Sequence, residues 1–134
     1  PEEIYNDPAN IFVAQFIGTP KMNILEINEK NVISQNSINL LGNDIKFDNL
    51  KLIKSKHYVG IRPEHLKANQ KTQFTFNPEI ELIENLGNEK IIYIKKGEHQ
   101  LSAKIPNKVE ISNSIGFDVN DVFIFDQNGK RVKF

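Results

Sequence analysis

The residues most often used for catalysis or metal binding near neutral pH are scattered along this chain. Its three histidines, His57, His65 and His99, form no HxH or HxxxH pair, and the chain has no cysteine. A zinc site with thiolate ligands and a disulfide are therefore excluded. No Gly-x-Ser-x-Gly nucleophile elbow occurs, although a Ser-His-Asp group assembled from distant residues stays open. Residue type and spacing thus predict no catalytic site and no metal site.

The phosphate-binding loop Gly-x-x-x-x-Gly-Lys-Ser/Thr is absent as well. In nucleotide hydrolases the backbone amides of this loop cradle the phosphates, and its lysine contacts them. We therefore expect that this chain by itself is not an enzyme and binds no nucleotide or other cofactor.

A compact motif, Gly60-Ile-Arg-Pro-Glu, is predicted to end a strand in a turn. Gly60 permits close backbone approach, and Pro63 fixes the turn. Arg62 and Glu64 then have two interpretations. They either form a surface ion pair worth about 0–1 kcal/mol, or they contact another subunit.

A second motif, Glu84-Asn-Leu-Gly-Asn-Glu, ends at Glu89 and joins two apolar runs. It lacks the alternating ligands and the terminal glutamate spacing of a calcium-binding loop. A hairpin turn with Gly87 at positive φ is the better interpretation, because glycine adopts that conformation without steric cost.

The elements that position these motifs are predicted to be one helix followed by many short strands. Residues 1–17 are typical of a helix that has Pro8 in its first turn and ends at Gly18. Phe12 and Phe16 lie four residues apart on its apolar stripe. The helix packs either on a domain outside this chain or on the strands of this chain, and its stripe is an interface candidate.

Downstream of residue 23, apolar runs of four to six residues rich in Ile, Val and Phe alternate with turn signals, which is typical of strands. The predicted strands are 24–27, 32–35, 37–41, 45–47, 50–54, 58–61, 74–76, 80–83, 91–94, 101–105, 122–125 and 132–134. Hairpin turns are predicted at 28–31 and, more strongly, at Asn128-Gly129. So many short strands favour a small barrel or sandwich.

Composition limits the function classes. The hydrophobic residues make up 39% of the chain. The formal net charge is zero, which argues against a large nucleic-acid footprint. No apolar run approaches the ~20 residues of a membrane helix, and no signal peptide is visible. Because the chain begins with Pro1, we expect it to be part of a longer protein. The polar segment 67–71 is either a boundary between two strand groups or a loop within one barrel.

Four motifs in order resemble the C-terminal accessory region of the ATP-binding subunit of carbohydrate ABC importers, the maltose and glycerol-3-phosphate type. In that family the ATPase domain ends in a helix that resembles residues 1–18, and a Pro-x-Met-Asn segment similar to 20–23 follows. Gly60-Ile-Arg-Pro-Glu-His matches the second motif. Segment 81–89 matches the third, and segments 123–126 and 129–132 together match the fourth.

The resemblance implies a mainly β fold, an OB-like, molybdate-binding-protein-like (TOBE) small barrel in residues 19–134, preceded by the terminal helix 1–18 of the ATPase domain. It implies a regulatory and dimerisation domain that holds two ATPase subunits together at the cytoplasmic face of the membrane. The implied partners are a second copy, the ATPase domain in cis, the permease indirectly, and a phosphotransferase-system protein or transcription regulator. ATP and Mg²⁺ are expected only in the ATPase domain.

Two other functions stay open at this point. Related barrels bind oxyanions such as molybdate, so a small-ligand sensor is an alternative. A stacking platform for single-stranded nucleic acid on an OB fold also fits the aromatic residues Phe74, Phe76, Tyr93, Phe117, Phe123, Phe125 and Phe134. A barrel core equally needs apolar residues two positions apart along a strand. Because the net charge is zero, we favour the core interpretation.

Overall fold

The computed structural model describes residues 9–10, 20–52 and 56–134. The predicted helix 1–17, with Phe12 and Phe16, lies almost wholly outside these residues. The described part is mainly β, as predicted, and contains short 3-10 turns but no α-helix. It divides into two compact units, one formed by Pro1–Ile61 with Val122–Phe134 and the other by Arg62–Asp121. The polar segment 67–71 lies within the second unit.

Unit 1 contains two antiparallel sheets. The first has the order β1-β5-β12-β13, with β1 Asn23–Ile27, β5 His57–Ile61, β12 Val122–Phe125 and β13 Arg131–Val132. The second has the order β2-β3-β4, with β2 Val32–Ser34, β3 Ser37–Leu40 and β4 Asn43–Lys46. Alternating side chains of β1 and β3 are buried, which is the period of two that a half-buried strand requires.

Two turn predictions in unit 1 have different outcomes. The turn at Asn128-Gly129 joins the paired strands β12 and β13, and Gly129 has a φ of +80°, as predicted. The hairpin predicted at 28–31 is wrong. Those residues form a 3-10 turn, η1 (Glu29–Asn31), closed by a capping box with Asn28. Strand β1 pairs with β5 rather than with β2, so the turn leads from one sheet into the other.

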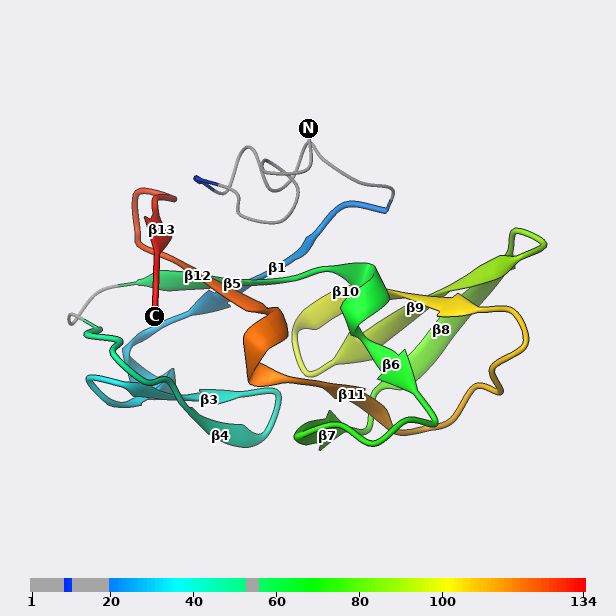
Figure 1. Ribbon diagram of the computed structural model, residues 1–134, viewed down its shortest axis with the longest axis horizontal. Helices are drawn as coiled ribbons and strands as arrows, with labels where there is room; N and C mark the ends of the chain where they lie inside the picture. Colours follow the sequence, from blue (N-terminus) through cyan, green and yellow to red (C-terminus); the bar gives the residue numbers. More distant parts are fainter. Residues whose placement is uncertain (1–8, 11–19, 53–55) are drawn as a thin grey trace. The chain divides into compact units, whose positions relative to one another are not determined.

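Unit 2 also contains two sheets (Figure 1). The larger has the order β10-β9-β8, with β8 Glu79–Asn85, β9 Glu89–Lys96 and β10 His99–Pro106. The smaller has the order β6-β11-β7, with β6 Lys67–Ala68, β11 Ile115–Phe117 and β7 Phe74–Phe76. The sequence of unit 2 begins and ends with 3-10 turns, which are η2 (Pro63–His65) and η3 (Val119–Asp121).

The core of unit 2 comes from the inward-facing residues of these strands. In β10, every second residue from Leu101 to Ile105 is buried. Phe117 is fully buried, with Phe74 and Phe76 packed at ring-centroid distances of 5.6 and 6.2 Å. The aromatic residues of β7 and β11 therefore serve as core.

The barrel part of the fold prediction is not met in the described residues. Closure requires the first and last strands of a sheet to pair. In none of the four sheets of the described residues do the first and last strands pair with each other, so none closes. The strands are of two to eight residues, and turns that switch sheets interrupt them.

Candidate functional site

Close packing in unit 1 fixes the position of Gly60, the first residue of the Gly60-Ile-Arg-Pro-Glu motif. A Cβ atom at Gly60 would lie 2.5 Å from Met22 Sδ and 3.1 Å from Phe125 Cε2, closer than such atoms normally approach. Any side chain at this position would require the buried Met22 side chain to shift, and glycine avoids that clash. Gly60 is thus a packing position that brings β5 against the Met22 side chain.

Arg62 and Pro63 are buried rather than displayed. Arg62 is only 2% exposed, so the interpretation as half of a surface ion pair is wrong. Burial lowers the pKa of its guanidinium from the ordinary value, because a charged group loses solvation in the interior. Pro63 occupies the first position of η2, where its missing N–H costs no hydrogen bond. Both residues shape the turn that presents Glu64 and His65.

Two of the predicted motif residues, Glu64 and Glu89, line one cavity of about 190 Å³, although they lie far apart in sequence. Glu64 comes from η2 and Glu89 from the first position of β9. They meet because η2 and β6 both pack against β10, the neighbour of β9 in the larger sheet. We call this the Glu64–Glu89 cavity. Its lining residues are Glu64, Leu66, Lys67, Ala68, Gln70, Glu89, Lys104, Ile105 and Pro106.

The polar groups of the Glu64–Glu89 cavity carry both signs of charge. Lys104 Nζ lies 3.5 Å from Glu89 Oε1, and these side chains are 27% and 46% exposed. Glu64 and Lys67 form no ion pair with residues in the described part of the chain. Leu66, Ala68 and Ile105 are at most 2% exposed and form a buried apolar floor that offers almost no accessible surface to the cavity.

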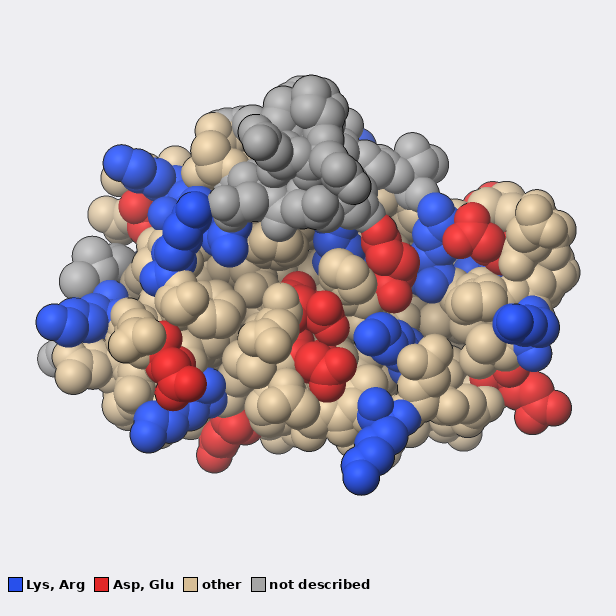
Figure 2. Space-filling view, in the orientation of Figure 1, with Lys and Arg blue, Asp and Glu red and all other residues tan. Residues whose placement is uncertain are grey.

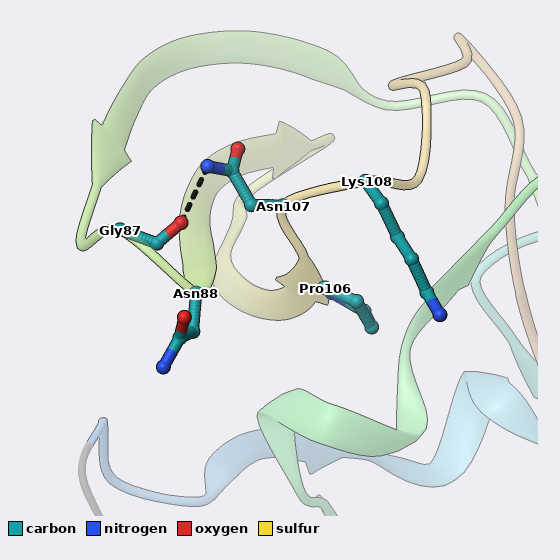
Figure 3. Close-up of a pocket in the computed structure, with 5 residues that line it drawn as sticks. All are labelled: Gly87, Asn88, Pro106, Asn107 and Lys108. Carbon is teal, nitrogen blue, oxygen red and sulfur yellow. Dashed lines mark hydrogen bonds between the residues drawn. The ribbon is translucent and has the colours of Figure 1, made fainter.

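A second, more open depression adjoins this cavity at Pro106 and is shown in Figure 3. Its sides are the β8–β9 turn, with Gly87 and Asn88, and the end of β10, with Asn107 and Lys108. The Asn107 side-chain amide donates to the Gly87 carbonyl and so holds the turn to β10. Gly87 has a φ of +96°, which confirms the predicted hairpin conformation.

The outer strand of the larger sheet displays apolar side chains to solvent. Strand β8 has β9 on one side only, and Leu82, Ile83 and Leu86 on and beside it are 61%, 46% and 55% exposed. We call Leu82, Ile83 and Leu86 the β8 patch, although Leu82 and Ile83 are consecutive in the strand and so point to opposite faces of the sheet at its edge. Exposed Glu79, Glu81 and Glu84 lie along the same strand, and Glu84 accepts a 3.5 Å hydrogen bond from Tyr93. A bulge interrupts the β8–β9 register between Ile80 and Leu82.

Several of these residues carried no recognisable signal in the sequence. Lys67, Gln70 and Lys104 are polar residues that match no motif, and only tertiary packing brings them to the cavity. The β8 patch does carry a signal in the sequence. Leu82, Ile83 and Leu86 stand in a run that breaks the alternation expected of a half-buried strand.

The histidines are not assembled into a metal or catalytic cluster. His65 Nδ1 lies 3.8 Å from Asp121 Oδ1, which is an ion-pair distance if the imidazole is protonated but too long for a hydrogen bond. Within the described residues, no group of three or more His, Cys, Asp or Glu is arranged to hold a metal ion. No helix in the described part of the chain is long and apolar enough to cross a membrane.

Acidic and basic side chains are interspersed on the face shown in Figure 2. Long-range attraction of a highly charged partner needs one sign of charge over a broad area. The visible face of the described residues therefore offers shape and local contacts rather than a strong steering field.

Comparison with curated proteins gives a consistent set of relatives, whereas no family model matches the chain. The sn-glycerol-3-phosphate import ATP-binding protein of Psychromonas ingrahamii is 32% identical over 98% of this chain and 37% of its own length. The alpha-glucoside transport ATP-binding protein of Rhizobium meliloti is 30% identical over 99% of this chain and 40% of its own length. The multiple sugar-binding transport ATP-binding protein of Streptococcus mutans is 33% identical over 78% of this chain and 30% of its own length.

The chain thus spans between 30% and 40% of the length of these relatives. The match covers nearly all of this chain, including both units and the motifs around Gly60 and Gly87. Over nearly its whole length the chain is therefore homologous to one part of the ATP-binding subunits of sugar and sn-glycerol-3-phosphate importers.

Proposed function

We propose that this chain is the C-terminal regulatory and dimerisation region of the ATP-binding subunit of a bacterial carbohydrate ABC importer. The observation that carries this proposal is the match over 98% of the chain to only 37% of an import ATP-binding protein. The chain has no phosphate loop. ATP binding and hydrolysis then belong to the rest of the subunit, at the cytoplasmic face of the membrane and in contact with the permease.

The β8 patch supports the dimerisation part of this proposal. Leu82, Ile83 and Leu86 place three large apolar side chains in water, each at least 46% exposed. Exposed large apolar residues along an edge strand are typical of a surface that a partner covers. In the proposal the partner is a second copy, in which the same residues meet across a two-fold axis.

Side-chain packing rather than a continuous backbone ladder would join the two copies. The bulge between Ile80 and Leu82 bends the strand and limits edge-to-edge hydrogen bonding. A joint that persists while the ATPase domains open and close would keep those domains at a high effective concentration. It would also offer a surface on which a regulatory protein favours one state over the other.

Sedimentation equilibrium of the whole chain over a concentration series tests the proposal. We expect a reversible monomer–dimer equilibrium, and we expect Leu82→Gln combined with Leu86→Gln to shift it strongly to monomer. The matched control is Ile33→Gln, because Ile33 is 54% exposed but lies on β2 in unit 1. The control should dimerise like the wild type.

Two results would contradict the proposal in different ways. A wild-type chain that stays monomeric at every concentration removes the dimerisation role. A double variant that dimerises as tightly as the wild type keeps that role but removes the β8 patch as its surface. Circular dichroism should report an unchanged fold in all variants, since the substituted side chains are exposed.

A further inference from the structure

We propose that the Glu64–Glu89 cavity binds a small neutral polyhydroxylated molecule, such as a monosaccharide. The biological meaning of this inference, a sensor for the imported substrate class, rests on the proposed function. The binding itself depends only on the cavity.

The size of the cavity limits the ligand. Its volume of about 190 Å³ lies below the roughly 300–1,000 Å³ of pockets that hold drug-sized ligands. A single sugar ring or a glycerol molecule is therefore the largest kind of occupant that it encloses. An oligosaccharide or a protein segment would extend beyond the cavity.

The balance of charge excludes a strongly charged occupant. Two carboxylates, Glu64 and Glu89, and two ammonium groups, Lys67 and Lys104, line the same space. An oxyanion attracted by the lysines would be repelled by the carboxylates, and a cation would meet the opposite pair of effects. This arrangement argues against the oxyanion-sensor alternative at this cavity.

The polar groups instead match hydroxyl groups, which both donate and accept hydrogen bonds. Carboxylate oxygens of Glu64 and Glu89 accept from a hydroxyl, whereas Lys67 and the Gln70 amide donate to one. Lys67 and Gln70 have no side-chain hydrogen bond or ion pair to the described residues, so their donors are available.

The apolar residues of the cavity add little contact area. Leu66, Ala68 and Ile105 are at most 2% exposed, so the polar groups and the exposed Pro106 provide most of the surface that a ligand contacts. A zwitterion such as L-alanine would have to compete with the Glu89–Lys104 pair at 3.5 Å.

The test uses two-dimensional ¹H–¹⁵N NMR of the whole chain titrated with D-glucose and, separately, with glycerol. We expect saturable shifts of the Lys67, Ala68, Glu89 and Lys104 amides with at least one of these probes. Sulfate and L-alanine are the comparison probes for an oxyanion and a zwitterion. Saturable shifts at these amides with only sulfate or only alanine would overturn the neutral-ligand assignment.

Variants separate binding at the cavity from weak binding elsewhere. Lys67→Met and Gln70→Ala keep the buried floor intact and should each raise the dissociation constant about tenfold or more, the effect of about 1.4 kcal/mol. Gln127→Ala, in the exposed turn of unit 1, is the control and should bind like the wild type. Unchanged binding in both cavity variants, or no shifts with any probe, would overturn the proposal. Neither result depends on dimerisation, so this failure is distinct from failure of the proposed function.

Discussion

The buried side chain of Asn23 donates a hydrogen bond from Nδ2 to the carbonyl oxygen of Ile61 at 3.0 Å. The same two residues are register partners in the antiparallel β1–β5 pair. One belongs to the Pro-Lys-Met-Asn segment and the other to the Gly-Ile-Arg-Pro-Glu-His segment, so the first two sequence motifs are joined in one sheet. Asn23 thus fixes where β1 begins relative to the end of β5.

Replacing Asn23 by alanine should lower the free energy of unfolding by about 1–3 kcal/mol, because a buried carbonyl loses a donor. Urea denaturation followed by circular dichroism measures the change. Asn39→Ala is the matched control. Asn39 Nδ2 donates to Asp44 Oδ1 at 2.8 Å near the surface, and its loss should cost only about 0.5 kcal/mol or less. Equal losses in the two variants would contradict the special role of Asn23.

Gly60→Ala should destabilise the chain by about 1–3 kcal/mol, since the added methyl group overfills a packed core. The new Cβ would lie 2.5 Å from Met22 Sδ, so the cost should fall when Met22 is shortened. A double-mutant cycle with Met22→Ala tests this coupling. The double variant should be more stable than the sum of the two single losses by about 0.5 kcal/mol or more. Strict additivity would show that the strain arises elsewhere.

The exposed Lys56–Glu26 pair predicts a pH dependence confined to alkaline conditions. The nitrogen–oxygen distance is 3.2 Å, and the hydrogen bond and charge of Glu26 raise the pKa of Lys56 above its ordinary 10.5. The folded-state pKa exceeds the unfolded value, so the stabilisation is complete below pH 10.5 and disappears as pH rises through the folded pKa. The effect should be small, since both side chains are about half exposed.

The measurement compares wild type with Glu26→Gln by urea denaturation at several pH values. The difference in unfolding free energy should stay constant up to about the ordinary pKa of lysine and shrink above it. Glu29→Gln, an exposed residue of η1, is the control and should show no such change. A difference that grows with alkaline pH would contradict the assigned sign.

The proposed dimer should become tighter as salt is added. Two copies joined through the β8 patch would bring their exposed Glu79, Glu81 and Glu84 side chains near one another. Raising ionic strength from about 0.1 M to about 1 M shortens the Debye length from about 10 Å to about 3 Å and weakens this repulsion. Sedimentation equilibrium at both salt concentrations measures the change.

Glu79→Gln combined with Glu84→Gln provides the control for that salt effect. Without two of the three carboxylates, dimerisation should already be tighter at low salt, and its salt dependence should be flatter. A dimer that dissociates on salt addition would instead indicate attraction between opposite charges, and a different contact surface.

Local sequence signals were sufficient for most strands and for particular turns. The strand predicted at 50–54 is wrong for its described residues 50–52, and β6 and β11 were not predicted. Gly87 and Gly129 adopt positive φ at the predicted hairpins, because no other residue enters that conformation at so little cost. The runs around 91–94 and 101–105 form paired strands with the predicted burial of Leu101 and Ile105. The four ordered motifs were also enough to indicate the family to which the relatives belong.

Pairing between distant segments was decided only in the tertiary structure. The turn at 28–31 has the composition of a hairpin, yet β1 pairs with β5, since register depends on which buried faces meet rather than on the nearest turn. Arg62 looked like a surface residue, but it is 2% exposed. Glu64, Lys67, Gln70 and Glu89 share a cavity because η2 and β6 pack against β10. Such contacts depend on long-range packing, which a local pattern of residue types does not encode.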